Sequence, residues 1–114
     1  MADRKIGEPE LTPHAAIALF EKAVKDNPRD ARAHLNLASA YYVAHDLDAA
    51  FTELQEAIAL SPSLDHAHYY LGVIYAKRGD TAKARAEWEK VIGGSAHSML
   101  KSQASMQLAT LGAK

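Results

Sequence analysis

Apolar residues recur at spacings of three and four along most of the chain, as in helices that bury one face. In the first such stretch the recurring residues are Ala16, Ile17, Phe20, Ala23 and Val24. Further stretches of this kind, separated by short polar segments, predict about six helices, over residues 12–26, 31–44, 47–60, 66–78, 81–92 and 98–111. Since no stretch alternates in the manner of a strand, the sequence predicts an all-α fold.

The predicted helices have local start and stop signals. Thr12 offers a capping hydroxyl, and Pro13 suits the first helical position. Aspartates are the expected caps of the next four helices, at Asp30, Asp46, Asp65 and Asp80. Gly79 is expected to end its helix in the left-handed backbone conformation, and His45 is at the same position in the preceding hairpin. Because the connections have only two to five residues, neighbouring helices are expected to be antiparallel and to stack as hairpins.

A period of 34 residues runs through the middle of the chain. It pairs His34 with His68, Leu37 with Leu71, Ala38 with Gly72, Tyr41 with Tyr75, Ala50 with Ala84 and Leu54 with Trp88. A fixed period in this range is typical of stacked supersecondary units. The small residues in this set allow two helices to approach closely, and the large ones fill the spaces between them.

These residues resemble the tetratricopeptide repeat (TPR), whose pattern is W-x2-L-G-x2-Y, then A-x3-F, then P. The resemblance implies a TPR superhelix with full units at 31–64 and 65–94, a half repeat at 12–28 and a capping helix at 97–114. Residues 1–11 lack periodicity and are expected to be flexible. Two departures are that His34 and His68 replace tryptophan and that Gly93-Gly94 replaces a proline at the third boundary.

In this family the first helix of each pair lines a concave face that grips a peptide or helix of a partner. Carried onto this chain, that face consists of Arg32, Leu35, Asn36, Ser39, Tyr42, Val43, His66, Tyr69, Tyr70, Val73 and Lys77. Leu35, Tyr42, Tyr69, Tyr70 and Val73 are expected to form one continuous apolar strip. The alternative is that the terminal segment or the cap covers these side chains. A clamp for a C-terminal carboxylate, known in one subgroup, is largely missing, because only Asn36 matches it.

The expected function is therefore that of a non-enzymatic adaptor for a protein or peptide. The alternative is a structural scaffold that associates with itself, a homo-oligomer. The half repeat leaves one edge of helix 12–26 open, and charge is uneven along the chain. Residues 1–64 hold ten acidic and six basic residues, whereas residues 65–114 hold four and seven. Opposite charges at the two ends favour head-to-tail contacts.

Composition removes several other functions. The net charge of −1 gives no general attraction to nucleic acid or to an anionic membrane. Cysteine is absent, and His34 and His68 have no expected carboxylate in register, so packed histidines are expected in place of a metal site. We find no catalytic or cofactor motif. The opening residues lack the apolar core of a signal peptide, and no apolar run could span a membrane, so a cytoplasmic protein without membrane insertion is expected.

Overall fold

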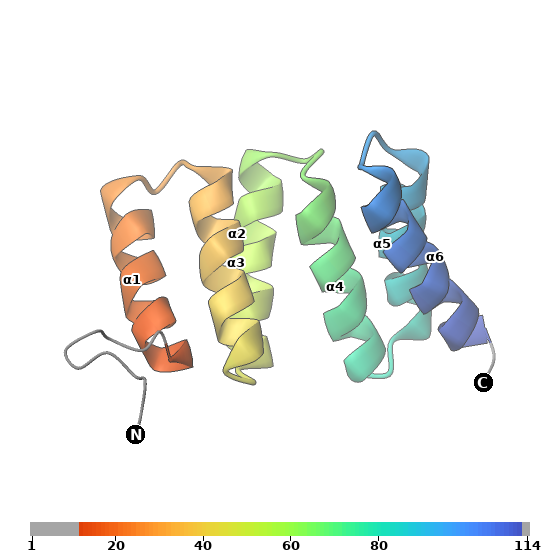
Figure 1. The fold of residues 1–114 in the computed structure, drawn as a ribbon, viewed down its shortest axis with the longest axis horizontal. Helices are drawn as coiled ribbons and strands as arrows, with labels where there is room; N and C mark the ends of the chain where they lie inside the picture. The colour runs from red at the N-terminus through yellow and green to blue at the C-terminus, as the bar shows by residue number, and fades with distance from the viewer. Residues whose placement is uncertain (1–11, 113–114) are drawn as a thin grey trace, which may run out of the picture.

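The computed structural model describes residues 12–112, so the predicted flexible segment 1–11 lies outside the described residues. The described chain forms six α-helices and no strand (Figure 1), which confirms the all-α prediction. The helices are α1 (Pro13–Asp26), α2 (Ala31–Val43), α3 (Leu47–Leu60), α4 (Asp65–Lys77), α5 (Thr81–Gly93) and α6 (Ser98–Gly112). The expected bounds agree with these to within one residue.

Side-chain caps begin four of the helices as expected. The Thr12 hydroxyl accepts a hydrogen bond from the Ala15 amide, and Asp30, Asp46 and Asp80 accept equivalent bonds from the first turns of α2, α3 and α5. The expectation for Asp65 is wrong. Asp65 is the first helical residue of α4, and the cap position is held by Leu64, which makes no capping hydrogen bond. Leu64 is partly buried against the first core cluster, so α4 begins one residue earlier than expected without a side-chain cap.

The two hairpin turns adopt the left-handed backbone that the sequence predicts. His45 has a φ of 66° and Gly79 a φ of 84°. In both turns the next amide closes the helix in the same way: that of Asp46 donates to the Tyr41 carbonyl, and that of Asp80 donates to the Tyr75 carbonyl. The two hairpins are therefore alike although one carries a histidine where glycine is the less strained residue.

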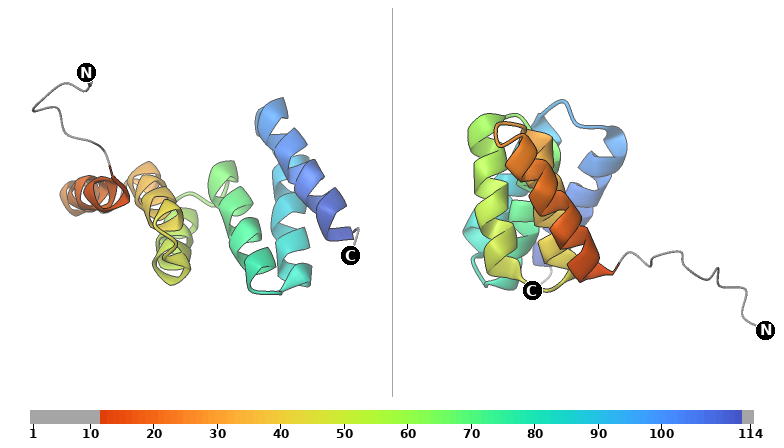
Figure 2. Two further views of the ribbon diagram at one scale, coloured as in Figure 1. Left: turned by 60° about the horizontal axis from the view of Figure 1, so that its bottom comes forward. Right: turned by 90° about the vertical axis from the view of Figure 1, so that its left-hand side faces the viewer.

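The helices stand side by side in a row with α1 at one end and α6 at the other (Figures 1 and 2). The pairs α2–α3 and α4–α5 are complete hairpins, and Figure 1 shows α2 in front of α3. We call α2 and α4 leading helices, and α3 and α5 trailing helices. At the ends, α1 packs on α2, and α6 packs on α5 with a smaller contact to α4.

Two apolar clusters hold the row together. The first lies among α2, α3 and α4, and the second lies among α4, α5 and α6. Within each hairpin a small residue of the leading helix faces a large residue of the trailing helix. In the second hairpin a Cβ added to Gly72 would overlap the indole of Trp88, and the Trp88 Nε1 donates to the Tyr69 carbonyl at 3.1 Å. The core therefore sets the spacing of the leading helices, which carry the candidate site.

Candidate functional site

The leading helices present most of the side chains that the sequence assigns to a partner surface. Arg32, Asn36 and Val43 of α2 and His66 and Lys77 of α4 are exposed or partly exposed. Half-buried members lie between them, at Ser39, Tyr42, Tyr69, Tyr70 and Val73. We call these ten residues the inner face.

Leu35 does not belong to this surface. Its side chain is only 5% exposed, and it is part of the first core cluster. The expectation that Leu35 contributes to an accessible apolar strip is therefore wrong. The physical reason is that Leu35 packs into the cluster where α2, α3 and α4 meet, whereas the spacing rule treats the inner side of each helix as free.

Three tyrosines form the centre of the inner face. The rings of Tyr42 and Tyr70 lie 6.0 Å apart across the gap between α2 and α4. Tyr70 also meets Tyr69 edge to face, with 5.8 Å between ring centroids. Such contacts hold the rings in fixed positions and add about 0.5–1.5 kcal/mol per pair beyond area burial. The structure thus brings Tyr42 and Tyr70 together from helices 28 residues apart in the sequence.

The last helix covers part of the same face. Tyr69 and Val73 pack against the second core cluster, and the Gln107 side chain donates to the Tyr69 hydroxyl at 3.1 Å. The alternative that the cap covers inner-face residues therefore holds in part for these two, which are half-buried. Tyr42 and Tyr70 pack instead against the first cluster, whose other members come from α2, α3 and α4. The half-buried aromatic surface accordingly centres on Tyr42 and Tyr70.

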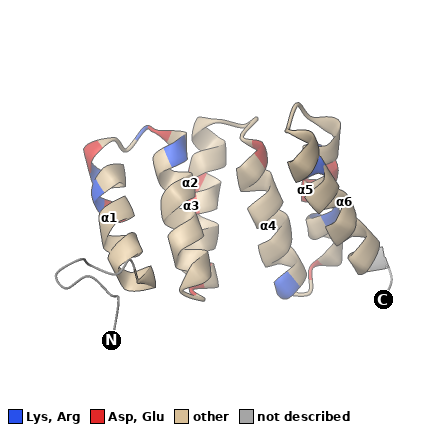
Figure 3. Cartoon of the chain, viewed as in Figure 1, with Lys and Arg blue, Asp and Glu red and all other residues tan. Residues whose placement is uncertain are grey.

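Charged residues lie around the inner face and leave its middle uncharged. Figure 3 shows charged residues near the ends of α2 and α4 and uncharged residues along the visible lengths between them. Arg32 is in the first turn of α2, and Asp65 and Lys77 are the first and last residues of α4. A pocket of about 210 Å³ opens at the Lys77 end, lined by Tyr42, Val43, His45, Leu47 and Lys77. A partner on this surface would meet an apolar centre with a polar rim, which is the common anatomy of an interface.

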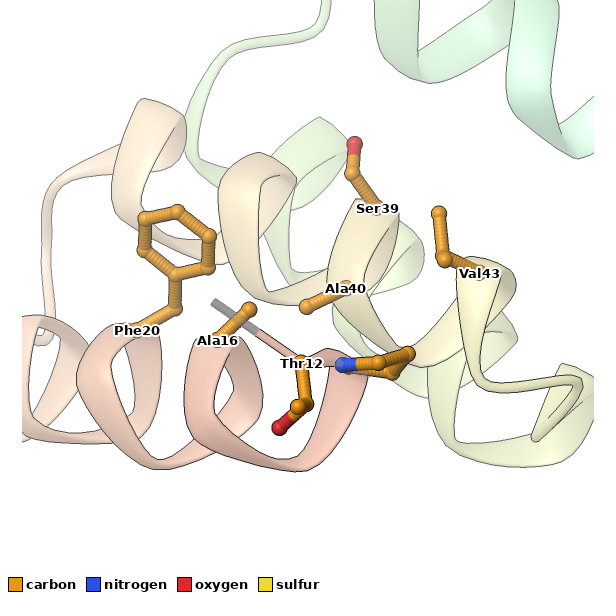
Figure 4. A pocket seen from close by; sticks show the side chains of 7 residues that line it. Thr12, Ala16, Phe20, Ser39, Ala40 and Val43 are labelled. Carbon is orange, nitrogen blue, oxygen red and sulfur yellow. The ribbon is translucent and has the colours of Figure 1, made fainter. Parts of the chain in front are cut away.

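A second pocket, of about 280 Å³, lies between α1 and α2 (Figure 4). It is lined by Thr12, Pro13, Ala16, Phe20, Ser39, Ala40 and Val43. In Figure 4 the side chains of Ala16 and Ala40 face each other, and Phe20 and Val43 stand toward opposite ends. Since Ser39 and Val43 also belong to the inner face, the pocket extends that face toward α1. Its walls are apolar apart from two hydroxyl groups.

The repeated histidines are buried and bound on both ring nitrogens. His34 Nδ1 lies 2.7 Å from Glu53 Oε1, and its Nε2 lies 2.7 Å from the Pro28 carbonyl. His68 repeats the arrangement with Glu87 at 2.6 Å and the Pro62 carbonyl at 2.8 Å. Carbonyl and carboxylate oxygens accept hydrogen bonds, so both contacts of one ring are satisfied together when both nitrogens carry protons.

Burial by itself lowers the pKa of His34, because it disfavours the charged ring. The hydrogen bonds to Glu53 and to the Pro28 carbonyl, with the charges of Glu53 and Glu56, outweigh this effect and raise the pKa of His34 above its ordinary 6.5. Burial and a hydrogen bond to Glu21 raise the pKa of Tyr41 to about 12. The Tyr41 hydroxyl donates to Glu21 Oε2 at 2.9 Å and so ties α2 to α1.

The glutamate partners were missed at the sequence level. We expected no carboxylate in register with the histidines, and this is wrong, because Glu53 and Glu87 each follow their histidine by 19 residues. The signal was available, since both members of each pair recur with the 34-residue period. One helix alone cannot reveal the histidine–glutamate contact, because its two residues lie on different helices of the hairpin.

Among residues 12–112, no three or more His, Cys, Asp or Glu side chains are arranged to hold a metal ion. None of the described helices has both the length and the apolar character needed to cross a bilayer.

Comparison with known proteins agrees with this architecture. A family model described as the tetratricopeptide repeat matches residues 13–65 and 54–96. The chain is 31% identical over 70 residues to the inactive TPR repeat-containing thioredoxin TTL3 of Arabidopsis thaliana, and equally so to TPR repeat-containing thioredoxin TTL4 of that organism. Each alignment covers 61% of this chain and 10% of the relative, so the chain spans about a tenth of these proteins.

Solved structures, among them the following two, are similar in fold. The crystal structure of MamA superposes with a TM-score of 0.66 at 36% identity, covering 70% of this chain and 47% of that one. A thermophilic TPR protein of Thermus thermophilus superposes with a TM-score of 0.74 at 23% identity, covering 85% of this chain and 50% of that one. The second likeness concerns the fold alone.

The family match covers most of the described helices, and the fold agrees with it. The chain therefore belongs to the tetratricopeptide repeat family, and its repeats make it a protein–protein interaction module. Proteins with this fold are generally interaction modules and not enzymes.

Proposed function

We propose that this chain is a non-enzymatic adaptor that binds a peptide or a helix of a partner protein on its inner face. The observation that carries the proposal is the pair of half-buried tyrosines, Tyr42 and Tyr70, held in ring contact on two leading helices. They are flanked by exposed polar residues and by Val43, which is 60% exposed. Immobile aromatic rings lose little conformational entropy on binding, so they are effective anchors at interfaces.

The chemistry of the rim supports a partner segment with an apolar centre and acidic ends. Arg32 and Lys77 are the cations of the inner face, Arg32 in the first turn of α2 and Lys77 at the last residue of α4. Asn36 adds amide groups that can bind a peptide backbone. A bound segment would place its apolar side chains over Tyr42 and Tyr70 and its carboxylates near the two cations.

The test is capture of partner proteins from a native lysate by wild-type chain and by Tyr42→Ala and Tyr70→Ala variants. Loss of an interface anchor typically costs at least about 2 kcal/mol, which weakens binding roughly 30-fold. The captured partner should then be titrated against each variant to measure this factor. Gln55→Ala, on an exposed part of α3, is the matched control and should bind as the wild type does.

Melting curves of the same variants separate binding from folding. We expect the tyrosine variants to remain folded under assay conditions while affinity drops. If both variants bind the partner with wild-type affinity, the inner face is not the binding surface. If both lose many degrees of melting temperature, Tyr42 and Tyr70 act as core residues, since loss of a buried aromatic side chain costs about 3–5 kcal/mol.

A second candidate function is self-association as a structural scaffold. The observation that favours it is the open pocket beside α1, at the end of the row. A terminal helix with an uncovered apolar side is a natural place for another copy to pack. This candidate does not exclude the first, because the tyrosines at the centre of the inner face lie outside that pocket.

A further inference from the structure

Helix α1 has the pattern of a trailing helix without its leading helix. Ala16 and Phe20 correspond by the 34-residue period to Ala50 and Leu54. Ala50 and Leu54 are almost completely buried against α2, whereas Ala16 and Phe20 are only half-buried and line the pocket beside α1. Leu19 corresponds by the same period to Glu53, which contacts His34, but Leu19 is 55% exposed. Within residues 12–112, no leading helix covers this side of α1.

Helix α6 lacks the other half of a hairpin. It has the burial pattern of a leading helix, but no trailing helix packs on it in the described part of the chain. Its buried residues Leu100 and Ala104 match the buried Ala67 and Leu71 of α4 with a constant offset of 33 residues. The same offset aligns Ser105 with Gly72, the position that must be small where a trailing helix packs. Ser105 is nevertheless exposed, since no trailing helix follows α6 in the described part of the chain.

We propose that α6 of one copy packs into the open side of α1 of a second copy, so that the two helices complete a third hairpin across a head-to-tail interface. The proposal rests on the second candidate function, self-association. A second copy is the occupant that the pattern favours, because the open ends are the two complementary halves of one repeating unit. Each copy keeps one free end of each kind, so successive copies extend the row, and such contacts form a filament unless the rotation closes a ring.

The register of the complete hairpins assigns the contacts of this interface. Ser105 would face Phe20 of the next copy, as Gly72 faces Trp88 and as the small Ala38 corresponds to Leu54. Lys101 corresponds to His68, and Leu19 corresponds to Glu87. Lys101 would therefore lie against Leu19 in the position where each complete hairpin has its histidine–glutamate pair.

The first experiment measures self-association of the full chain by sedimentation equilibrium from micromolar to millimolar concentration. Leu19→Lys places a second cation against Lys101 and is expected to weaken association at least about tenfold. Leu19→Glu is the matched control, since it restores the acidic residue of the complete units and should associate at least as well as the wild type. Both substitutions are at an exposed position, and melting curves verify that the fold is kept.

The second experiment establishes that the contact is head-to-tail. Ser105→Trp fills the small position on α6 and is expected to abolish association, whereas Ser102→Trp, also exposed on α6 but aligned with the inner-face residue Tyr69, should not. A Leu19→Lys chain keeps its α6 end, and a Ser105→Trp chain keeps its α1 end. Mixing the two should therefore give a dimer that does not grow further, although each alone stays monomeric at the same concentration.

Three other outcomes would refute the proposed α6–α1 interface. A wild-type chain that stays monomeric at every concentration refutes both self-association and this contact. Association that is lost in Leu19→Lys but kept in Ser105→Trp indicates a symmetric contact between two α1 helices. Association that no variant changes leaves the scaffold function standing and refutes the α6–α1 contact alone.

Discussion

The buried His34 predicts that the fold loses stability as the pH rises above about 6.5. His34 contacts two oxygen acceptors, Glu53 Oε1 and the Pro28 carbonyl, each at 2.7 Å. Loss of one ring proton leaves a nitrogen lone pair directed at one of these oxygens. The perturbation is therefore a stepwise change of pH from 5.5 to 9, applied to the wild-type chain.

The sign follows from the raised pKa of His34, since the folded state holds the proton more tightly than the unfolded state. The stabilisation is fully present below the unfolded pKa of about 6.5. It is lost as the pH rises through the raised folded pKa. One proton difference gives a slope of about −1.4 kcal/mol per pH unit at most.

The size of the loss follows from the burial of the pair. The side chains of His34 and Glu53 are 8% and 20% exposed, so solvent screens their interaction only weakly. Hydrogen bonds to charged groups contribute about 1.5–3 kcal/mol each. The free energy of unfolding should fall by about 1.4 kcal/mol for each pH unit by which the folded pKa of His34 exceeds its unfolded pKa, out of a total of about 5–15 kcal/mol for a domain.

The assay is urea unfolding followed by circular dichroism at each pH, with Glu53→Gln as the matched variant. The amide can donate to an unprotonated Nδ1 while Nε2–H still donates to the Pro28 carbonyl, so neutral His34 is satisfied in that variant. Glu53→Gln should be less stable than the wild type at pH 5.5 and should show a shallower pH dependence. Wild-type stability that is flat or rises between pH 6 and 9, or an unchanged slope in Glu53→Gln, would refute the assigned protonation.

Two further predictions concern backbone and packing. His45→Gly should raise stability by about 1 kcal/mol, measured as a higher melting temperature, because His45 has a φ of 66°; a clear decrease would show that the imidazole makes a stabilising contact. Gly72→Ala should cost about 1–3 kcal/mol in urea unfolding, since the added methyl meets the Trp88 indole. Trp88→Leu, which copies the Ala38–Leu54 pair of the first unit, should recover part of that loss in the double variant, and simple additivity of the two costs would contradict the packing argument.

Local interactions account for the features that the sequence predicted correctly. A cap is decided by a side chain and an amide three residues away, as for Thr12 and Ala15, and the left-handed turns depend on one residue each. The repeat period then places equal residues at equal positions in the stack. Helix number, helix bounds and the hairpin order were therefore readable from the sequence alone.

Contacts between helices decided the rest. The burial of Leu35 depends on the cluster where α2, α3 and α4 meet, and the partial cover over Tyr69 depends on Gln107, 38 residues later in the chain. The pairing of His34 with Glu53 joins two helices across a hairpin. Helical periodicity gives the direction of each side chain around the helix axis. Which side of the helix stays free depends on the neighbouring helices, and only the tertiary structure fixes their positions.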